Sequence, residues 1–278
     1  MAETSVSRAR HTQNVSKRSW HAGHQNLLLI ASLPALMFLL LPLVALVLRI
    51  PPAQLLANVL QPDVAQAIWV SVVTTLITLG LTIIAGTPLA YLLARRRFRG
   101  RTMLDTLIDL PMVLPPSVAG IALLVAFGRR GLLGQYISAA GVDIAFSQAA
   151  VVLAQTFVAA PFYIKSAISG FAGVDGELEQ AAALDGASAP QVFRHVTLPL
   201  AGTALFAGAV MTWARALGEF GATIIFAGNF PGRTQTMPLA IYIGFELELN
   251  VALTLSVLLL GVSFAVLFVV KGVLRERI

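Results

Sequence analysis

The chain contains no cysteine and few charged residues. Of its 278 residues, 12% are charged and 57% are hydrophobic. The lack of cysteine excludes disulfides and thiolate metal sites. Soluble domains contain about 25% charged and about 45–50% apolar residues. The mean hydropathy of +0.83 therefore indicates a polytopic membrane protein, with one membrane domain.

The sequence also lacks the patterns that most catalytic sites need. It holds no Gly-x4-Gly-Lys-Ser/Thr sequence, so we do not expect it to bind ATP through a P-loop. None of its four histidines lies in a predicted cavity, so no Ser/His/Asp set is expected. We therefore expect a protein that is not an enzyme, with no catalytic residue, no metal site and no cofactor.

Six apolar segments are long enough to cross a membrane, which takes about 20 residues. Residues 1–26 before them are polar and basic, and we expect a disordered cytoplasmic tail there. The remainder, residues 27–278, is predicted to be a single transmembrane domain. The predicted spans are residues 27–48, 64–94, 110–128, 144–164, 196–227 and 249–270.

Basic residues predict the orientation of these spans. Residues 94–101, ARRRFRGR, include five arginines and fix the end of the second span in the cytoplasm. Lys165 is expected at the cytoplasmic edge of the fourth span. With both termini in the cytoplasm, fourteen of the 19 lysines and arginines lie on that side. This distribution explains the pI near 10.3 without a nucleic-acid partner.

One segment between two apolar runs is polar and helix-like: residues 175–200, DGELEQAAALDGASAPQVFRHVTLPL. Good helix formers with early acidic residues are followed by Gly186, which is typical of a helix end. Ser188 and Pro190 are typical of the start of a second short helix. Pro199 then marks entry into the next apolar run. The pattern predicts a helix–Gly–helix module on the cytoplasmic face; the alternative is an ordinary amphipathic connector.

The spacing in this module resembles the cytoplasmic loop of ABC importer permeases. That loop has Glu-Ala-Ala, then Gly after three residues and Ile-x-Leu-Pro after nine more; here Gln180-Ala181-Ala182, Gly186 and residues 196–199 (VTLP) match. Gln180 stands where the family usually has Glu, so the partner contact is made either by Glu179 or by the Gln180 amide. The resemblance implies an all-α type I ABC importer permease fold with about six transmembrane helices. It also implies a coupling module, residues 175–199, that docks an ATPase. The expected coupling residues are Glu179, Gln180, Ala181, Ala182, Gly186, Leu198 and Pro199.

A second polar patch, RALGEFG at residues 215–221, lies inside the fifth predicted span. Arg215 and Glu219 are four residues apart and can share one helix face. A charge at this depth costs at least about 2.5–3.5 kcal/mol, so such groups are paired or face water. One interpretation is a gate or transient contact for an oxyanion; the other is a structural ion pair between helices. The expected gate residues are Arg215, Gly218, Glu219, Phe220, Gly221, Pro115 and Pro116.

The two prolines belong to LPMVLPPSVAG, residues 110–120, which predicts a kinked or broken span. Such a span either lines the translocation path or is bent only for packing. This stretch and residues 214–242 resemble the molybdate permeases of the molybdate/sulfate branch. Phe220 and residues 234–239 (TQTMPL) favour molybdate, because sulfate permeases usually have Tyr in the first of these places.

The resemblance implies a homodimeric, multi-pass permease subunit that moves molybdate or tungstate across the bacterial inner membrane. Its implied partners are a dimer of cytoplasmic ATP-binding subunits and a periplasmic or extracellular oxyanion-binding protein. A sulfate or thiosulfate permease is the nearest alternative. An ion-driven carrier or channel would need a relay of carboxylates within the membrane, and only Glu219 lies in a predicted span. A purely structural anchor fits poorly with broken, charged spans.

Overall fold

The computed structural model describes residues 31–275, so the tail predicted at 1–26 lies outside the described residues. Every regular element within 31–275 is helical. The chain divides into two compact units, Met1–Pro51 and Pro52–Ile278. In the first unit the described residues form the helix Ala31–Arg49, whose mean hydropathy of 2.5 and length of 19 residues suit a membrane span.

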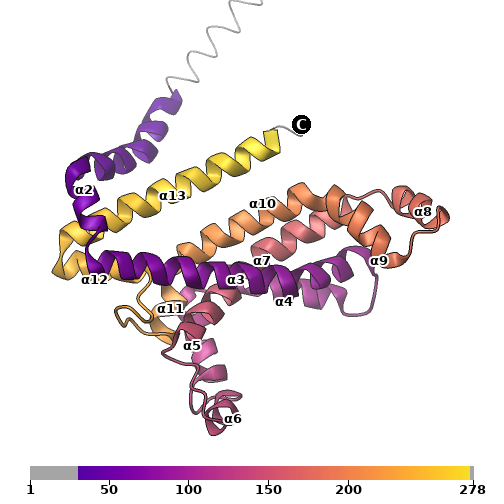
Figure 1. Cartoon of the computed structure of the whole chain (residues 1–278), viewed down its shortest axis with the longest axis horizontal. Helices are drawn as coiled ribbons and strands as arrows, with labels where there is room; N and C mark the ends of the chain where they lie inside the picture. The colour runs from indigo at the N-terminus through magenta and orange to yellow at the C-terminus, as the bar shows by residue number, and fades with distance from the viewer. Residues whose placement is uncertain (1–30, 276–278) are drawn as a thin grey trace, which may run out of the picture. The chain divides into compact units, whose positions relative to one another are not determined.

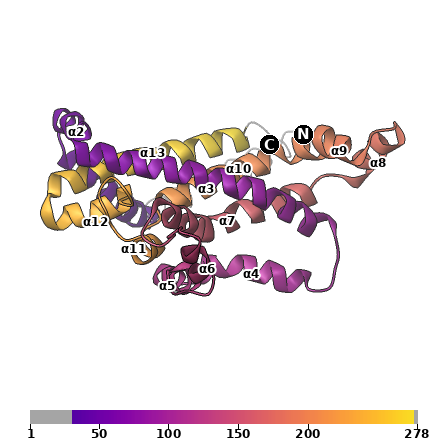
Figure 2. The same ribbon diagram turned by 60° about the horizontal axis from the view of Figure 1, so that its bottom comes forward.

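Three long helices form the centre of the second unit. Helices α3 (Pro62–Arg95), α7 (Gln148–Ala172) and α10 (Leu198–Leu217) lie side by side in Figures 1 and 2. A Cβ atom added at Gly208 of α10 would lie 2.6 Å from the Ser166 Cβ, and one at Gly170 of α7 would lie 2.7 Å from the Ala204 Cβ. Because carbon atoms do not approach so closely, these small residues are what allow α7 and α10 to pack.

A row of buried hydroxyl groups runs along α3 between its neighbours. Thr75 Oγ1 accepts a hydrogen bond from Trp213 Nε1 of α10 at 3.1 Å. Thr78 Oγ1 donates to Gln155 Oε1 of α7 at 3.2 Å. These bonds satisfy polar groups that are expensive to bury alone, and they join the three central helices. The buried hydroxyl residues of α3 are Ser71, Thr74, Thr75, Thr78 and Thr82.

The number of spans agrees with the prediction of about six. Among the described residues, five helices are long and apolar enough to cross a membrane, and one bent pair of helices brings the number to six. The pair is α4 (Arg101–Val113) and α5 (Pro116–Phe127), bent by 116°. The predicted break is therefore confirmed at Pro115, and the bent pair of helices begins at Arg101 and not at Leu110 as predicted.

The polar start of α4 is helical because it packs on α7. Lys165 Nζ donates to Asp105 Oδ1 and to Asp109 Oδ2, each at 2.9 Å. The sequence predicts Lys165 at the cytoplasmic edge of its span. It lies inside α7, which continues to Ala172, because the two aspartates provide partners for its charge.

Two other predicted boundaries were wrong. Helices α9 (Ala189–Val192), η1 (Phe193–Thr197) and α10 form one continuous run, so the short second helix of the module and the fifth span, which was predicted to begin at residue 196, are a single helix. The π-helical turn η1 ends two residues before Pro199 and includes the position four residues before it, where the carbonyl of an ordinary helix would clash with the proline ring. The fifth span was also predicted to continue to Ala227, but α10 ends at Leu217 and a break precedes α11 (Gly221–Phe226).

The remaining elements are short helices and one long final helix. Helix α2 (Pro52–Val59) lies in the predicted loop before α3, and α6 (Gly134–Ala139) lies in the loop before α7. Helix α12 (Met237–Leu247) lies between the fifth and sixth predicted spans. Helix α13 (Leu249–Arg275) is the last predicted span, extended beyond Val270.

Candidate functional site

The coupling module has the predicted helix–Gly–helix structure. Helix α8 (Gly176–Leu184) starts at Asp175, whose Oδ1 accepts a hydrogen bond from the Glu177 N–H at 2.9 Å. After α8 the chain turns at Gly186, whose φ is +91°. Glycine is favoured there because this left-handed conformation strains residues that carry a Cβ. The next helix opens at Ser188, whose N–H donates to Gln191 Oε1 at 2.7 Å as in a capping box.

Most of the module is open to solvent. Gln180, Ala181, Gly186 and Pro199 are exposed, whereas Ala182 and Leu198 are half-buried. Figures 1 and 2 place α8 and α9 at the opposite end of α10 from α11. The small alanines leave the surface of α8 accessible for close approach by another protein.

Glu179 differs from its neighbours because its carboxylate is engaged within the chain. Its Oε1 accepts hydrogen bonds from Arg95 Nη2 at 2.8 Å and from Thr197 Oγ1 at 2.5 Å. Arg95 Nη2 also donates to the Val174 carbonyl oxygen at 3.2 Å. Of the two residues considered for a partner contact, Gln180 therefore has the exposed side chain. The sequence signal for this network was weak, because Arg95 is one of five neighbouring arginines.

The patch at residues 215–221 also forms internal contacts. Arg215 Nη1 lies 2.8 Å from Glu219 Oε2, and the Glu219 side chain is only 1% exposed. Its other oxygen, Oε1, accepts the Ala222 N–H at 2.8 Å. Glu219 thus joins the end of α10 to the first turn of α11, which supports the structural interpretation. The Ala222 N–H is therefore not free for an anion, while Arg215 remains 31% exposed.

The structure brings the two predicted halves of the gate together. A Cβ atom added at Gly221 would lie 2.5 Å from the Pro116 Cβ, and one added at Gly120 would lie 2.9 Å from the Ala222 carbonyl oxygen. The broken helices α5 and α11 are therefore in backbone-close contact. Gly218 is different, because a Cβ there would meet nothing nearer than the Ala214 carbonyl oxygen at 3.8 Å.

The other two predicted gate residues lie beside this contact. Pro115 directly precedes α5, at the bend from α4. The ring of Phe220 packs against that of Tyr242 in α12, with 5.3 Å between the ring centroids. Phe220 therefore has a packing role within this chain, whatever it contributes to substrate choice.

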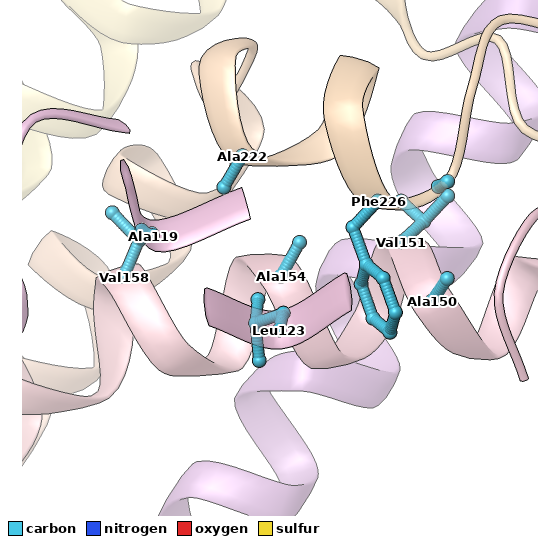
Figure 3. Close-up of a cluster of buried hydrophobic side chains, with 9 residues drawn as sticks. Ala119, Leu123, Ala150, Val151, Ala154, Val158, Ala222 and Phe226 are labelled. Carbon is cyan, nitrogen blue, oxygen red and sulfur yellow. The ribbon is translucent and has the colours of Figure 1, made fainter. Parts of the chain in front are cut away.

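Buried apolar side chains from α5, α7 and α11 pack together beside the α5–α11 contact. In Figure 3 they converge from three helices, with Phe226 of α11 reaching toward α7. The large central residues are Phe226 and Leu123, and small alanines surround them. Close packing of this kind resists deformation, so it holds α5 and α11 in fixed positions beside the polar link at Glu219. The cluster consists of Ala119, Leu123, Ala150, Val151, Ala154, Val158, Ala222, Phe226 and Ala227.

The loop between α5 and α7 carries an exposed ion pair that the sequence pattern does not predict. Arg129 donates two hydrogen bonds to the Asp143 carboxylate, and Ser138 Oγ donates a third at 2.7 Å. The bonds from Arg129 and then from Ser138 lower the pKa of Asp143 below its ordinary value. Both charged residues are exposed to solvent, so the pair has little effect on stability.

Comparison with known proteins identifies the class to which this architecture belongs. Residues 86–278 match the family of binding-protein-dependent transport system inner membrane components. The chain belongs to this family and is a multi-pass inner membrane protein. Members of the family are permease components of transporters, which confirms that the chain is not itself an enzyme.

The particular relatives include permease proteins of molybdenum and sulfate transport systems. The chain is 43% identical to the molybdenum transport system permease protein ModB of Mycobacterium tuberculosis over 84% of this chain and 89% of ModB. It is 37% identical to the sulfate transport system permease protein CysW of Escherichia coli over 80% of this chain and 77% of CysW. These similarities confirm the resemblance to the molybdate/sulfate branch.

Solved structures confirm the fold. A chain of a bacterial ABC transporter involved in import of the acidic polysaccharide alginate matches with a TM-score of 0.67 and 16% identity, over 93% of this chain and 99% of that one. A chain of the MetNI methionine ABC transporter in an inward-facing conformation matches with a TM-score of 0.59 and 20% identity, over 76% and 94% of the two chains. The fold is that of type I ABC importer permeases.

The link between α10 and α11 can be tested with two substitutions of Glu219. Glu219→Ala leaves the Arg215 charge and the Ala222 N–H without their partner. Breaking a fully buried ion pair costs about 3–5 kcal/mol, and we expect less here because Arg215 is 31% exposed. Glu219→Gln retains an acceptor for the N–H and should cost less than Ala. The measurement is the thermal unfolding midpoint of the purified protein in detergent. Equal midpoints for wild type and both variants would contradict the structural role.

Proposed function

We propose that the chain is the transmembrane permease subunit of an ABC importer for molybdate or tungstate. The observation that carries the proposal is the coupling module. It presents small and polar residues of α8 to solvent and turns at Gly186 in a left-handed conformation. Two cytoplasmic ATPase subunits would dock there, one on each copy of a permease homodimer. ATP hydrolysis takes place on these partners, since this chain has no P-loop.

The choice of substrate is supported by similarity and by charge. Relatives named for molybdenum transport, from Mycobacterium tuberculosis and Bacillus subtilis, share more identity with the chain than the sulfate permease does. Arg215 is the charged group at the break between α10 and α11 that could contact an oxyanion. Its pairing with Glu219 keeps that contact weak, which suits a permease because a tight site would hold the anion.

The transport cycle that we propose is an exchange between two conformations. An external binding protein delivers the anion to the outer loops, and the path lies at the two-fold interface of the homodimer. Closure of the ATPase subunits on ATP pushes the coupling modules and rocks the attached helices. The tightly packed α5–α11 contact at Pro116 and Gly221 is the part of each copy that would move as a unit against the other copy to open or close the gate.

Gly186→Pro tests the coupling role of the module. Proline fixes φ near −65°, whereas Gly186 has a φ of +91° and its N–H donates to the Ala183 carbonyl oxygen. We expect membrane insertion to survive, uptake to be abolished and the ATPase to dissociate or hydrolyse ATP without transport. Uptake, ATPase activity and co-purification of the ATPase are the measurements.

Gly176→Pro is the matched control for this variant. Gly176 is the first residue of α8, where proline is well tolerated, and the preceding Asp175 is already extended. We expect this control to keep transport and ATPase binding. Normal uptake by Gly186→Pro would show that the turn is not needed for coupling.

ATP-dependent uptake in proteoliposomes tests the substrate. The vesicles hold this chain with its ATPase and binding protein, and labelled molybdate is offered with excess sulfate, thiosulfate or tungstate. We expect tungstate to compete and sulfate not to. Uptake that sulfate blocks would place the protein with the sulfate permeases, the second candidate that the similarity to CysW favours. Uptake without any ATPase would overturn the importer mechanism and indicate an ion-driven carrier or channel.

A further inference from the structure

Three residues from separate elements meet where α8 joins the rest of the second unit. They are Arg95 at the last position of α3, Glu179 in α8, and Thr197 at the last position of η1, where α10 begins. Glu179 Oε1 accepts from Arg95 Nη2 at 2.8 Å and from Thr197 Oγ1 at 2.5 Å. We call these three residues the coupling strut.

The strut is sheltered although it lies in a polar part of the chain. The side chains of Arg95 and Glu179 are 21% and 20% exposed, and Thr197 is fully buried. Arg95 also reaches the carbonyl oxygen of Val174, which follows the end of α7. One carboxylate and one guanidinium therefore connect α8 to α3, to α10 and to the segment after α7.

Helix α8 has few other attachments. None of its residues is buried, and Leu184 at its end is 89% exposed. Its main packing neighbours are α9 and η1, which follow it in the chain and run directly into α10. The ion pair with Arg95 is therefore a direct link from α8 to α3 across more than eighty positions of the sequence, beside the indirect path through η1 into α10.

We propose that the coupling strut transmits the movement of α8 to α3 and α10, and that Glu179 is its central positioning residue. The proposal rests on the proposed function of the module as an ATPase docking site. It divides two adjacent side chains by role: Gln180 faces the partner and Glu179 faces the permease. A charge-assisted hydrogen bond is short and directional, so it fixes the position of α8 better than apolar contact at a wet surface would.

The strut predicts a loss of coupling rather than a loss of folding. When Glu179 is replaced by Ala, α8 stays capped by Asp175 and can still dock the ATPase, but its movement is no longer passed to α3. We expect Glu179→Ala and Arg95→Ala each to lower the number of anions imported per ATP hydrolysed at least fivefold. Glu179→Gln should recover part of this loss, because the amide oxygen can still accept both hydrogen bonds.

The experiment measures uptake and ATP hydrolysis side by side in the same proteoliposomes, using the complete complex and whichever anion supports wild-type uptake. The double variant Arg95→Ala/Glu179→Ala should be no worse than either single variant, because all three lose the same connection. Two controls remove a neighbouring charge of the same sign: Glu177→Ala in α8 and Arg96→Ala after α3. Both side chains are exposed, and both controls should keep the wild-type ratio.

The outcomes separate this proposal from the proposed function. Failure of the wild-type complex to import any of the oxyanions would overturn the function itself. If the wild-type complex imports an anion, and Glu179→Ala and Arg95→Ala import as many anions per ATP hydrolysed as the wild type, only the proposal of the strut is overturned. Losses that multiply in the double variant would also contradict it, because they would show two independent roles.

A variant of Thr197 covers the case in which Glu179→Ala fails to assemble. Thr197→Val removes only the hydroxyl group from a fully buried side chain of nearly the same shape. We expect it to assemble and to lower the ratio of import to hydrolysis by less than Glu179→Ala. Assembly of Thr197→Val with a wild-type ratio would count against the strut.

Discussion

The second unit depends on satisfying polar groups where water is scarce. Within a membrane every backbone N–H and C=O needs an internal partner, so a helix can be broken only where other groups replace its lost bonds. Breaks between apolar helices lie at Pro115 and after Leu217. At the second break the Glu219 carboxylate accepts the Ala222 N–H and pairs with Arg215. The same need explains the hydroxyl groups of α3 that bond to Trp213 and Gln155.

The two ends of α10 are held by different kinds of contact, close packing at one end and polar links at the other. At one end, glycine allows α11 to touch Pro116 of α5, and an apolar cluster supports that contact. At the other end, α8 has no buried residue and is tied to the helices by Glu179. A stiff helix thus has a tightly packed candidate gate at one end and a polar attachment for a partner at the other. This arrangement suits a protein that converts a push on one side into an opening on the other.

Much of this arrangement could be predicted from the sequence, because the features that specify it involve residues close together in the chain. The six apolar runs, the glycine turn at Gly186 and the break at Pro115 each follow from neighbouring residues. The boundaries failed where distant partners decided them: α4 starts at Arg101 because Asp105 and Asp109 meet Lys165 of α7. The link between Arg95 and Glu179 spans more than eighty residues and has no local signature. The continuous run through Pro199 depended on a π-helical turn that the residue pattern did not indicate.

The central claim is that α8 moves together with α3, and spin labels can test it directly. The native chain has no cysteine, so labels can be attached at cysteines introduced for Leu184 in α8 and Ile84 in α3, both highly exposed. The two distances to measure in the assembled transporter, with and without bound ATP, are Leu184 to Ile84 within one copy and Leu184 to Leu184 between copies. Labelled chain diluted into unlabelled chain isolates the first distance. The account predicts that ATP changes the distance between copies and leaves the distance within one copy unchanged. A within-copy change as large as the change between copies would contradict it.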